Sequence, residues 1–222
     1  IVEGSTVEVG SGARIDVSGS EGGQVSLGGG FQGQLGDGQN WYSTVPVPVV
    51  GLDSDVAAIS SAGVHTCALT QGGAVLCWGG NYAGALGDGT QVDRATPVEV
   101  SGMGAGVVAI AAGRNHTCAI KAGGSAYCWG LNSSGQLGDG SVADSAVPVQ
   151  VAGLTSGVSA IAAGGRHTCA LIAGGIVKCW GDSTGNGQGY AVLTPATVLG
   201  LSSHVTAVSA GFIHSCAIDA GA

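Results

Sequence analysis

A short motif that returns at an almost constant interval most constrains how this chain of 222 residues can fold. The motif is His-Thr-Cys-Ala-Leu or a close variant of it, and its cysteines are Cys67, Cys118, Cys169 and Cys216. The steps between these cysteines are 51, 51 and 47 residues. Such a period predicts a solenoid, a propeller or an array, because one unit cannot bury its apolar face without its neighbours.

A second motif, Cys-Trp-Gly, follows in each of the first three copies. Its cysteines are Cys77, Cys128 and Cys179. A pair of glycines lies between the two motifs, so the segment is predicted to be an antiparallel hairpin centred on Gly72 in the first copy. Strand alternation then places Cys67 directly opposite Cys77 and Trp78 on the other face. Opposed residues have Cα atoms about 4.5 Å apart, a separation that a disulfide accepts.

Three interpretations of these cysteines remain open: disulfides within each unit, free thiols, or metal ligands. Zinc sites favour shorter Cys-Cys spacings, but the histidine two residues before the first cysteine makes a Cys₂His site conceivable. We predict disulfides, and the pairs are Cys67–Cys77, Cys118–Cys128 and Cys169–Cys179. Cys216 is then unpaired or bonded to another chain. Disulfides indicate an oxidising compartment, so we expect an extracellular or cell-surface protein.

Each complete unit has room for three or four short strands and lacks helical periodicity, which predicts an all-β, propeller-type repeat protein. We predict a degenerate N-terminal repeat or cap at 1–55, repeats at 56–106, 107–157 and 158–204, and a truncated repeat at 205–222. A shift of 51 residues places Asp16 on Cys67 and Ser26 on Cys77, so the degenerate unit lacks both cysteines together. The chain begins at Ile1 and stops within a repeat, so we expect a processed or partial piece of a longer protein.

Composition weighs against several classes of partner. Charged residues are 9% of the chain, and a net charge of −8 goes with only six lysines and arginines, which form no cluster. We therefore expect neither nucleic-acid binding nor attraction to an anionic membrane. No apolar run approaches the roughly 18 residues of a spanning helix, so we expect no membrane span.

The repeating histidines and aspartates do not predict a catalytic, cofactor or metal site. One histidine per unit would be spread around a ring, and we expect each to hydrogen-bond the backbone of the next blade. Asp37, Asp88 and Asp139 lie in Leu-Gly-Asp-Gly turns, which supply one carboxylate each, too few for calcium. The chain has no phosphate-binding Gly-Lys-Ser/Thr loop and no Gly-x-Ser-x-Gly elbow. We predict a protein that is not an enzyme and needs no cofactor.

Aromatic residues outside the hairpin motif are candidates for recognition. We expect the repeat tryptophans Trp78, Trp129 and Trp180 to pack between blades. Trp41 lies elsewhere in its unit and is expected to be exposed. Together with Tyr82 and Tyr190 it forms the predicted interaction surface, because repeat scaffolds acquire specificity through loops.

Taken in order, these motifs resemble the regulator-of-chromosome-condensation repeat. The similarity covers residues 52–222 well and residues 5–51 more distantly. It implies a β-propeller, commonly of seven blades, of which about four are present, as part of a ring or an open assembly. The cysteine-bearing bacterial members, which are typically exported, are the most similar. Residues 13–19 also resemble the β-helix repeats of haemagglutinin-type adhesins.

The resemblance implies binding without naming a partner, because family members act through surface residues outside the repeat motif. We expect a non-catalytic secreted or cell-surface scaffold that presents propeller loops to a protein or glycan partner. The alternative is a structural subunit of an extracellular fibre or sheath that self-assembles through its end blades, with Cys216 bonded to another chain.

Overall fold

The protein is all-β, as predicted from its sequence. The computed structural model describes residues 6–9, 13–16, 24–27, 32–182, 191–201 and 203–221. These residues form strands and one 3-10 turn, η1 (Tyr82–Gly84). In this part of the chain, no helix is long and apolar enough to cross a membrane.

The strands form four sheets of four strands and a fifth sheet of two. The first sheet contains β1 (Thr6–Val9), β2 (Ala13–Asp16), β3 (Gln24–Leu27) and β4 (Val47–Pro48). The second contains β5 (Val56–Ala62), β6 (His65–Thr70), β7 (Val75–Gly79) and β8 (Arg94–Glu99). The third contains β9 (Val107–Ala112), β10 (His116–Lys121), β11 (Ser125–Gly130) and β12 (Ser145–Gln150). The fourth contains β13 (Val158–Ala163), β14 (His167–Ile172), β15 (Ile176–Gly181) and β16 (Val192–Thr197). The fifth contains β17 (Val205–Ala210) and β18 (Ser215–Asp219).

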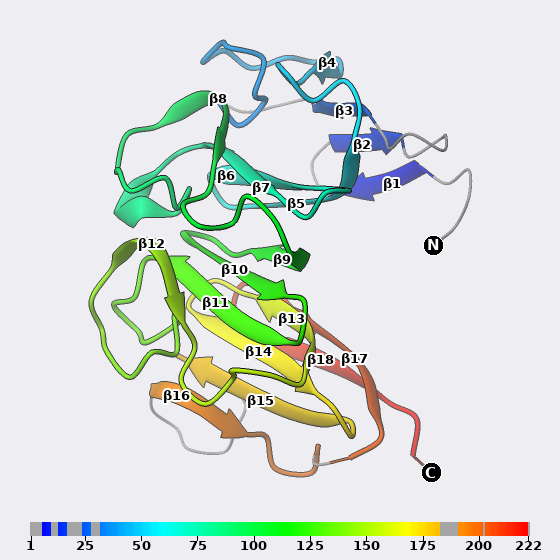
Figure 1. Cartoon of the computed structure of the whole chain (residues 1–222), viewed down its shortest axis with the longest axis vertical. Helices are drawn as coiled ribbons and strands as arrows, with labels where there is room; N and C mark the ends of the chain where they lie inside the picture. The colour runs from blue at the N-terminus through cyan, green and yellow to red at the C-terminus, as the bar shows by residue number, and fades with distance from the viewer. Residues whose placement is uncertain are drawn as a thin grey trace.

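The sheets follow one another like the blades of an open, incomplete propeller (Figure 1). Within each sheet consecutive strands pair antiparallel, so each blade is an up-and-down meander. The first strands of successive blades are neighbours, because β5 contacts β9, β9 contacts β13 and β13 contacts β17. These strands therefore follow the inside of the arc.

The central hairpins have the register predicted from the spacing of the cysteines. Cys67 lies opposite Cys77, and Leu69 lies opposite Val75. The structure contains three disulfides: Cys67–Cys77, Cys118–Cys128 and Cys169–Cys179. Their Cα separations are 4.0, 4.0 and 4.1 Å, close to the value for directly opposed residues. Cys216 is exposed and forms no disulfide.

Removing one of these disulfides is expected to destabilise its blade. The double substitution Cys118→Ser and Cys128→Ser should lower the free energy of unfolding by about 2–3 kcal/mol, the amount expected when a loop of this length is no longer closed in the unfolded chain. Urea denaturation monitored by circular dichroism measures the change. The control is Cys216→Ser, which should change stability by less than about 0.5 kcal/mol because the side chain is exposed. Equal effects of the two substitutions would contradict a stabilising role for the disulfide.

The core lies between blades as well as within them. Trp129 is fully buried and belongs to the same cluster as Leu86, Val100 and Met103, which come from the preceding unit. Trp180 is likewise buried in the cluster of the third blade. The predicted packing of the repeat tryptophans between blades is confirmed, and it explains why a single unit cannot fold without a neighbour.

The first sheet differs from the others in register. A shift of 51 residues would place Asp16 opposite Ser26, but Ser26 lies opposite Arg14, and Asp16 lies opposite Gln24. This unit lacks the cysteine pair that holds the other hairpins in one register. The hairpin of the first sheet therefore has its own register.

Candidate functional site

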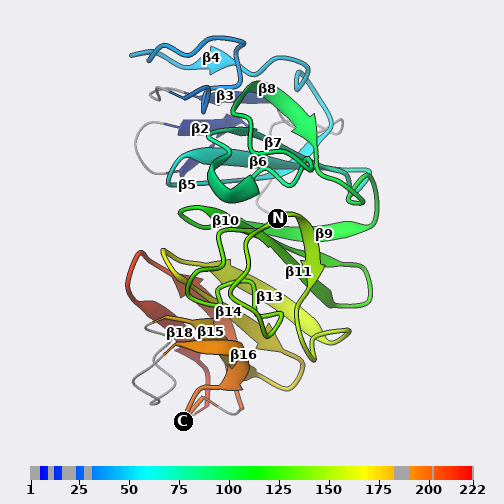
Figure 2. The same cartoon turned by 90° about the vertical axis from the view of Figure 1, so that its left-hand side faces the viewer.

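One side of the arc, which we call the loop face, carries the long loops that the structure describes. It holds the turns before β6, β10, β14 and β18 and the loops before β4, β8 and β12. The two groups are joined by backbone hydrogen bonds, such as the one from the Leu131 amide to the Asn115 carbonyl, at 2.8 Å. The loops lie on the left in Figure 1 and face the viewer in Figure 2. The opposite side, the hairpin face, holds the tight turns that follow β6, β10 and β14.

A buried asparagine organises the long loop of the second blade and that of the third. The side-chain amide of Asn132 donates to Asp139 Oδ1, at 3.2 Å, and to the carbonyls of Ser141 and Ala143, at 3.2 and 3.1 Å. Its Oδ1 accepts from the backbone N–H of Leu137 at 2.9 Å. Asn81 makes the equivalent contacts in the preceding blade. Sequence reasoning missed these residues, although an asparagine follows Cys-Trp-Gly-x in both loops.

The loop aspartates complete these networks. Asp88 accepts hydrogen bonds from the Thr90 hydroxyl at 2.7 Å and from Arg94 Nε at 3.0 Å. Burial raises the pKa of Asp88, but the hydrogen bonds from Thr90, Arg94 and Asn81 outweigh burial and bring the pKa below its ordinary value. The Asp88 carboxylate therefore stabilises the turn. Among the described residues, no group of three or more His, Cys, Asp or Glu could hold a metal ion.

Each long loop also lies on the outer strand of the next blade. The amide of Gly89 donates to the carbonyl of Ala146 in β12 at 2.9 Å. Gly84, in η1, has a φ of +82°, and a Cβ at this position would lie 2.4 Å from the Cα of Ala146. Only glycine allows this close approach, so the loop face is held rigidly to the neighbouring blade.

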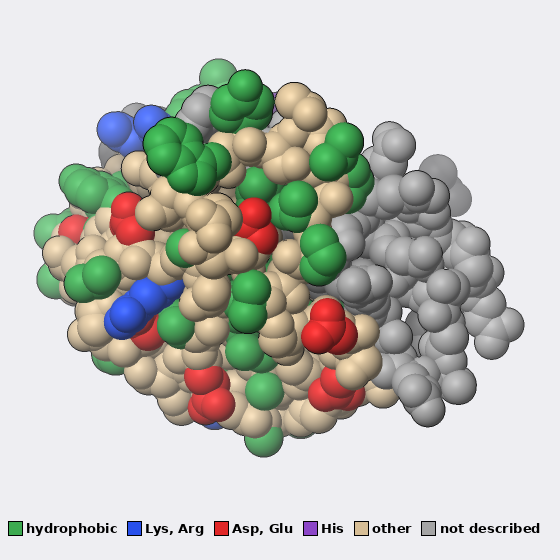
Figure 3. Space-filling model, turned by 90° about the horizontal axis from the view of Figure 1, so that it is seen from above, with side chains coloured by type: hydrophobic (Ala, Val, Ile, Leu, Met, Phe, Trp, Pro, Cys, Tyr) green, Lys and Arg blue, Asp and Glu red, His purple; other side chains and the backbone are tan. Residues whose placement is uncertain are grey.

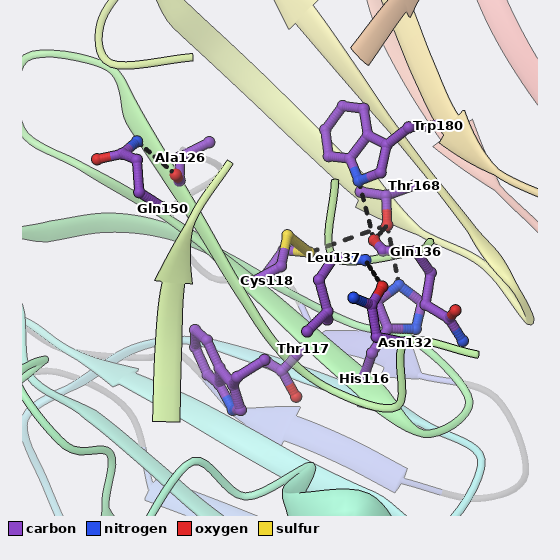
Figure 4. The surroundings of a disulfide bond; sticks show 12 residues. His116, Thr117, Cys118, Ala126, Asn132, Gln136, Leu137, Gln150, Thr168 and Trp180 are labelled. Carbon is purple, nitrogen blue, oxygen red and sulfur yellow. Dashed lines mark hydrogen bonds between the residues drawn. A yellow bond between two sulfur atoms is a disulfide. The ribbon is translucent and has the colours of Figure 1, made fainter. Parts of the chain in front are cut away.

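Four buried groups join the third blade to the fourth (Figure 4). Thr168 donates its hydroxyl hydrogen to the carbonyl of Gln136 at 2.9 Å, and the indole N–H of Trp180 donates to the same carbonyl at 2.9 Å. The Thr168 oxygen lies 2.9 Å from Nε2 of His116. Because the hydroxyl hydrogen is already used, the hydroxyl accepts from His116, which must carry its proton on Nε2. His65 and Thr117 form the same contact at 2.7 Å.

The sequence-based expectation that each histidine bonds the backbone of the next blade was therefore wrong about the acceptor, which is a side-chain hydroxyl. The hydroxyl does come from the next blade. In each blade, the residue that follows the motif histidine points toward the preceding blade and presents its hydroxyl there. Burial lowers the pKa of His65 to about 4 and that of His116 to about 3, where the neighbouring His65 and His167 contribute further. Burial also lowers the pKa of His167, although a backbone hydrogen bond with His214 opposes the shift. These histidines are neutral structural groups at pH 7.

A cavity of about 320 Å³ opens on the loop face where the inner turns of the blades meet. The Arg114 guanidinium lies over the ring of Phe212, with its central carbon 5.2 Å from the ring centroid. Backbone hydrogen bonds hold these turns together: the Arg114 amide donates to Gly164 at 3.1 Å, and the Gly165 amide donates to Phe212 at 3.0 Å. Phe212 is 57% exposed, so its ring is available to a ligand. Sequence reasoning missed this pair. The available signal was that the inner turn is regular from unit to unit except at the position that Arg114 and Phe212 occupy.

The structure describes two of the three predicted recognition residues. Trp41 is 76% exposed, as expected, and Tyr82 in η1 is 65% exposed. Val92 stands 51 residues after Trp41, so both occupy the same loop position in consecutive units, and Val92 is 59% exposed. Tyr190 lies outside the described residues. That these side chains form an interaction surface stays a prediction.

Apolar side chains are exposed at the end of the arc that holds the first two sheets. Among the described residues, Figure 3 shows them as separate groups on a largely polar surface, with single acidic and basic side chains between them. The segment from Trp41 to Val50 contributes several exposed apolar residues, including Tyr42 and Val45. Such exposed apolar surface is typical of contact with another macromolecule.

Comparison with known sequences identifies the repeat. The sequence profile of the regulator of chromosome condensation (RCC1) repeat matches residues 72–120 and 123–171, and a second profile of the same repeat matches residues 56–85, 107–136 and 158–188. The ultraviolet-B receptor UVR8 of Arabidopsis thaliana is 34% identical over 164 residues, which are 72% of this chain and 37% of UVR8. The human probable E3 ubiquitin-protein ligase HERC3 is 36% identical over 154 residues, 67% of this chain but 15% of HERC3.

Solved structures show the same fold. Human WBSCR16 superposes with a TM-score of 0.82 at 23% identity and covers 99% of this chain and 59% of that one. Prp20p of Saccharomyces cerevisiae superposes with a TM-score of 0.77 at 21% identity, over 98% of this chain and 56% of Prp20p. This chain thus spans little more than half of each of these propellers. The chain belongs to the regulator of chromosome condensation (RCC1) repeat family.

Proposed function

We propose that this chain is a non-catalytic interaction scaffold, secreted or at the cell surface, that binds a protein partner through its loop face. The observation that carries the proposal is the cavity beside Arg114 and Phe212 on the same face as the exposed Trp41 and Tyr82. Tryptophan, tyrosine and arginine are the residues that most often dominate binding energy at protein interfaces. The loop that carries Tyr82 is held by buried hydrogen bonds of Asn81, so little conformational freedom is lost there on binding.

The chemistry of the face favours a particular kind of partner segment. The chain is acidic overall, yet Arg114 and Arg166 both lie exposed on the inner turns beside β10 and β14. In the described part of the chain the one ion pair is Arg94–Asp88, so Arg114 is available to a carboxylate from outside. An acidic peptide segment that also carries an aromatic or aliphatic side chain fits both the guanidinium and the apolar wall of the cavity.

The buried groups support a binding role over a catalytic one. The repeat histidines and loop aspartates are occupied in holding blades and turns together. Three disulfides support an oxidising location outside the cytosol. The similar protein Prp20p binds Gsp1p and histones, and yeast RCC1 has been solved bound to Kap60, so these precedents favour a protein partner.

A selection experiment tests the proposal. Peptides selected on the intact protein from a displayed library should be acidic and apolar, and Trp41→Ala, Tyr82→Ala and Arg114→Ala should each weaken their binding roughly tenfold or more. The matched control is Leu199→Ala, which removes a side chain that is 78% exposed, in the turn after β16 on the hairpin face. Binders that respond to Leu199→Ala but not to the loop-face variants would overturn the proposal. If a glycan array gave ligands for the loop face and the peptide library gave none, the partner would be a glycan instead of a protein.

The alternative function is a structural subunit of an extracellular fibre or sheath. The exposed Cys216 and the edge of β18, which pairs only with β17 among the described residues, favour it. Light scattering of the unreduced protein distinguishes the two: a scaffold gives one discrete mass, and a fibre subunit gives a large, polydisperse mass that falls on reduction.

A further inference from the structure

Every proline of this chain lies in the outer strand of a blade or directly before it. The outer strands are β4, β8, β12 and β16, each at one end of its sheet. The five prolines are Pro46, Pro48, Pro97, Pro148 and Pro195. Four of them hold one position of the repeat, because Pro46, Pro97, Pro148 and Pro195 are separated by 51, 51 and 47 residues. Proline is typical of the free edge of a sheet, since it has no N–H to offer to a further strand.

The repeated prolines of β8, β12 and β16 turn their backbone to the outside of the blade. Val100, directly after β8, donates its amide to the carbonyl of Val75 at 3.0 Å, so the even-numbered residues of β8 face β7. The bulge in β8 adds an even number of residues, which keeps this alternation. Backbone groups alternate in direction along an antiparallel strand, so Pro97 and Ala95 face outward. The residues after β12 and β16 make the equivalent bond, so the prolines of these strands also face outward.

The long loop of the preceding unit covers the neighbouring outward-facing position. In each case a loop glycine donates its amide to the carbonyl of the residue two positions before the repeated proline. These pairs are Gly38–Ala95, Gly89–Ala146 and Gly140–Leu193, at 3.0, 2.9 and 3.0 Å. At two successive outward positions, each outer strand therefore has an occupied acceptor and then a missing donor.

We propose that this arrangement closes the rim of the arc, meaning the outer edges of β8, β12 and β16, to strand addition. An added strand needs free donors and acceptors at successive outward positions. The rim does not offer them, so neither an extended peptide nor a second copy of this chain continues the ladder of a blade. Only 9% of the residues are charged, so charge alone gives these edges little protection. A partner therefore recognises the rim or the faces through side chains, and this holds whether or not the loop face has the proposed function.

Restoring the missing N–H groups tests the proposal on the intact chain. The double variant Pro97→Val and Pro195→Val adds an outward donor to β8 and to β16, with a side chain that strands favour. It should self-associate at a concentration roughly tenfold or more below that of the unsubstituted chain, because a main-chain hydrogen bond contributes up to about tenfold in affinity. Light scattering measures the mass against concentration. Hydrogen exchange of the associated protein should show new protection of the amides of residues 95–99 and 193–197.

The matched control is the double variant Thr96→Val and Thr194→Val. Both threonines are exposed, so the control adds the same apolar side chains to the same two strands. Their backbone N–H groups face the third strand of the blade, so no outward donor is created. The control should therefore keep the mass of the unsubstituted chain.

Urea denaturation shows whether each variant is folded, and Pro195→Val alone is measured if the double proline variant does not fold. The proposal is overturned if a folded proline variant keeps the mass of the unsubstituted chain at every concentration. It is also overturned if the threonine control associates equally well, or if the associated proline variant gains no protection along β8 and β16.

Discussion

The Trp129→Ala variant is expected to lose about 3–5 kcal/mol of unfolding free energy, the cost of deleting a large aromatic side chain from a core. The indole is fully buried between the second and third blades, packed on residues such as Leu86 and Val100. It also donates to the carbonyl of Ala85 at 2.9 Å. The loss should be visible in urea denaturation. Because neighbouring blades stabilise one another, the transition should also broaden or divide into two.

Two further variants separate the contributions of this side chain. Trp129→Phe keeps much of the buried surface but loses the hydrogen bond to Ala85, so it should cost less than Trp129→Ala. The matched control is Trp41→Ala, which removes the same side chain from an exposed position and should change stability by no more than about 0.5 kcal/mol. If Trp41→Ala and Trp129→Ala had the same effect, inter-blade packing would not be the source of stability.

Stability is expected to fall steeply between pH 6.5 and about pH 4. Burial lowers the pKa of His65 to about 4 and that of His116 to about 3. Below pH 6.5 the unfolded chain binds protons at these histidines and the folded chain does not, so acid favours unfolding. Each such histidine contributes a slope of roughly 1 kcal/mol per pH unit, which ends once the pH falls below its folded pKa. The measurement is urea denaturation repeated across this range of pH.

The physical reason lies in the second ring nitrogen. Nδ1 of His65 and of His116 is buried without a hydrogen-bond partner among the described residues, while Nε2 donates to a threonine. Protonation would create a buried N–H with no acceptor. The variant His116→Gln should reduce the slope by roughly 1 kcal/mol per pH unit. The control is His204→Asn, which removes a histidine at an exposed position. A stability that stays flat from pH 7 to pH 5 would contradict the structural role of these histidines.

The hairpins and their disulfides could be predicted from the sequence because they are local. Ten residues separate the paired cysteines, and strand alternation leaves one register that brings both to the same face. The same alternation predicts that Trp78 points to the face of the sheet opposite Cys77. On that face only a neighbouring blade could bury the indole. The first unit lacks this cysteine pair, and its hairpin has a different register.

Contacts between blades were decided only by the tertiary structure. The hydroxyl that accepts from each histidine and the Arg114–Phe212 pair join residues about 50 or more positions apart. The period of the sequence predicts that similar units lie next to one another. It does not determine the distance or the angle between their sheets. That approach is set by packing of side chains across the interface, and it determines which polar groups meet and which apolar surfaces stay open.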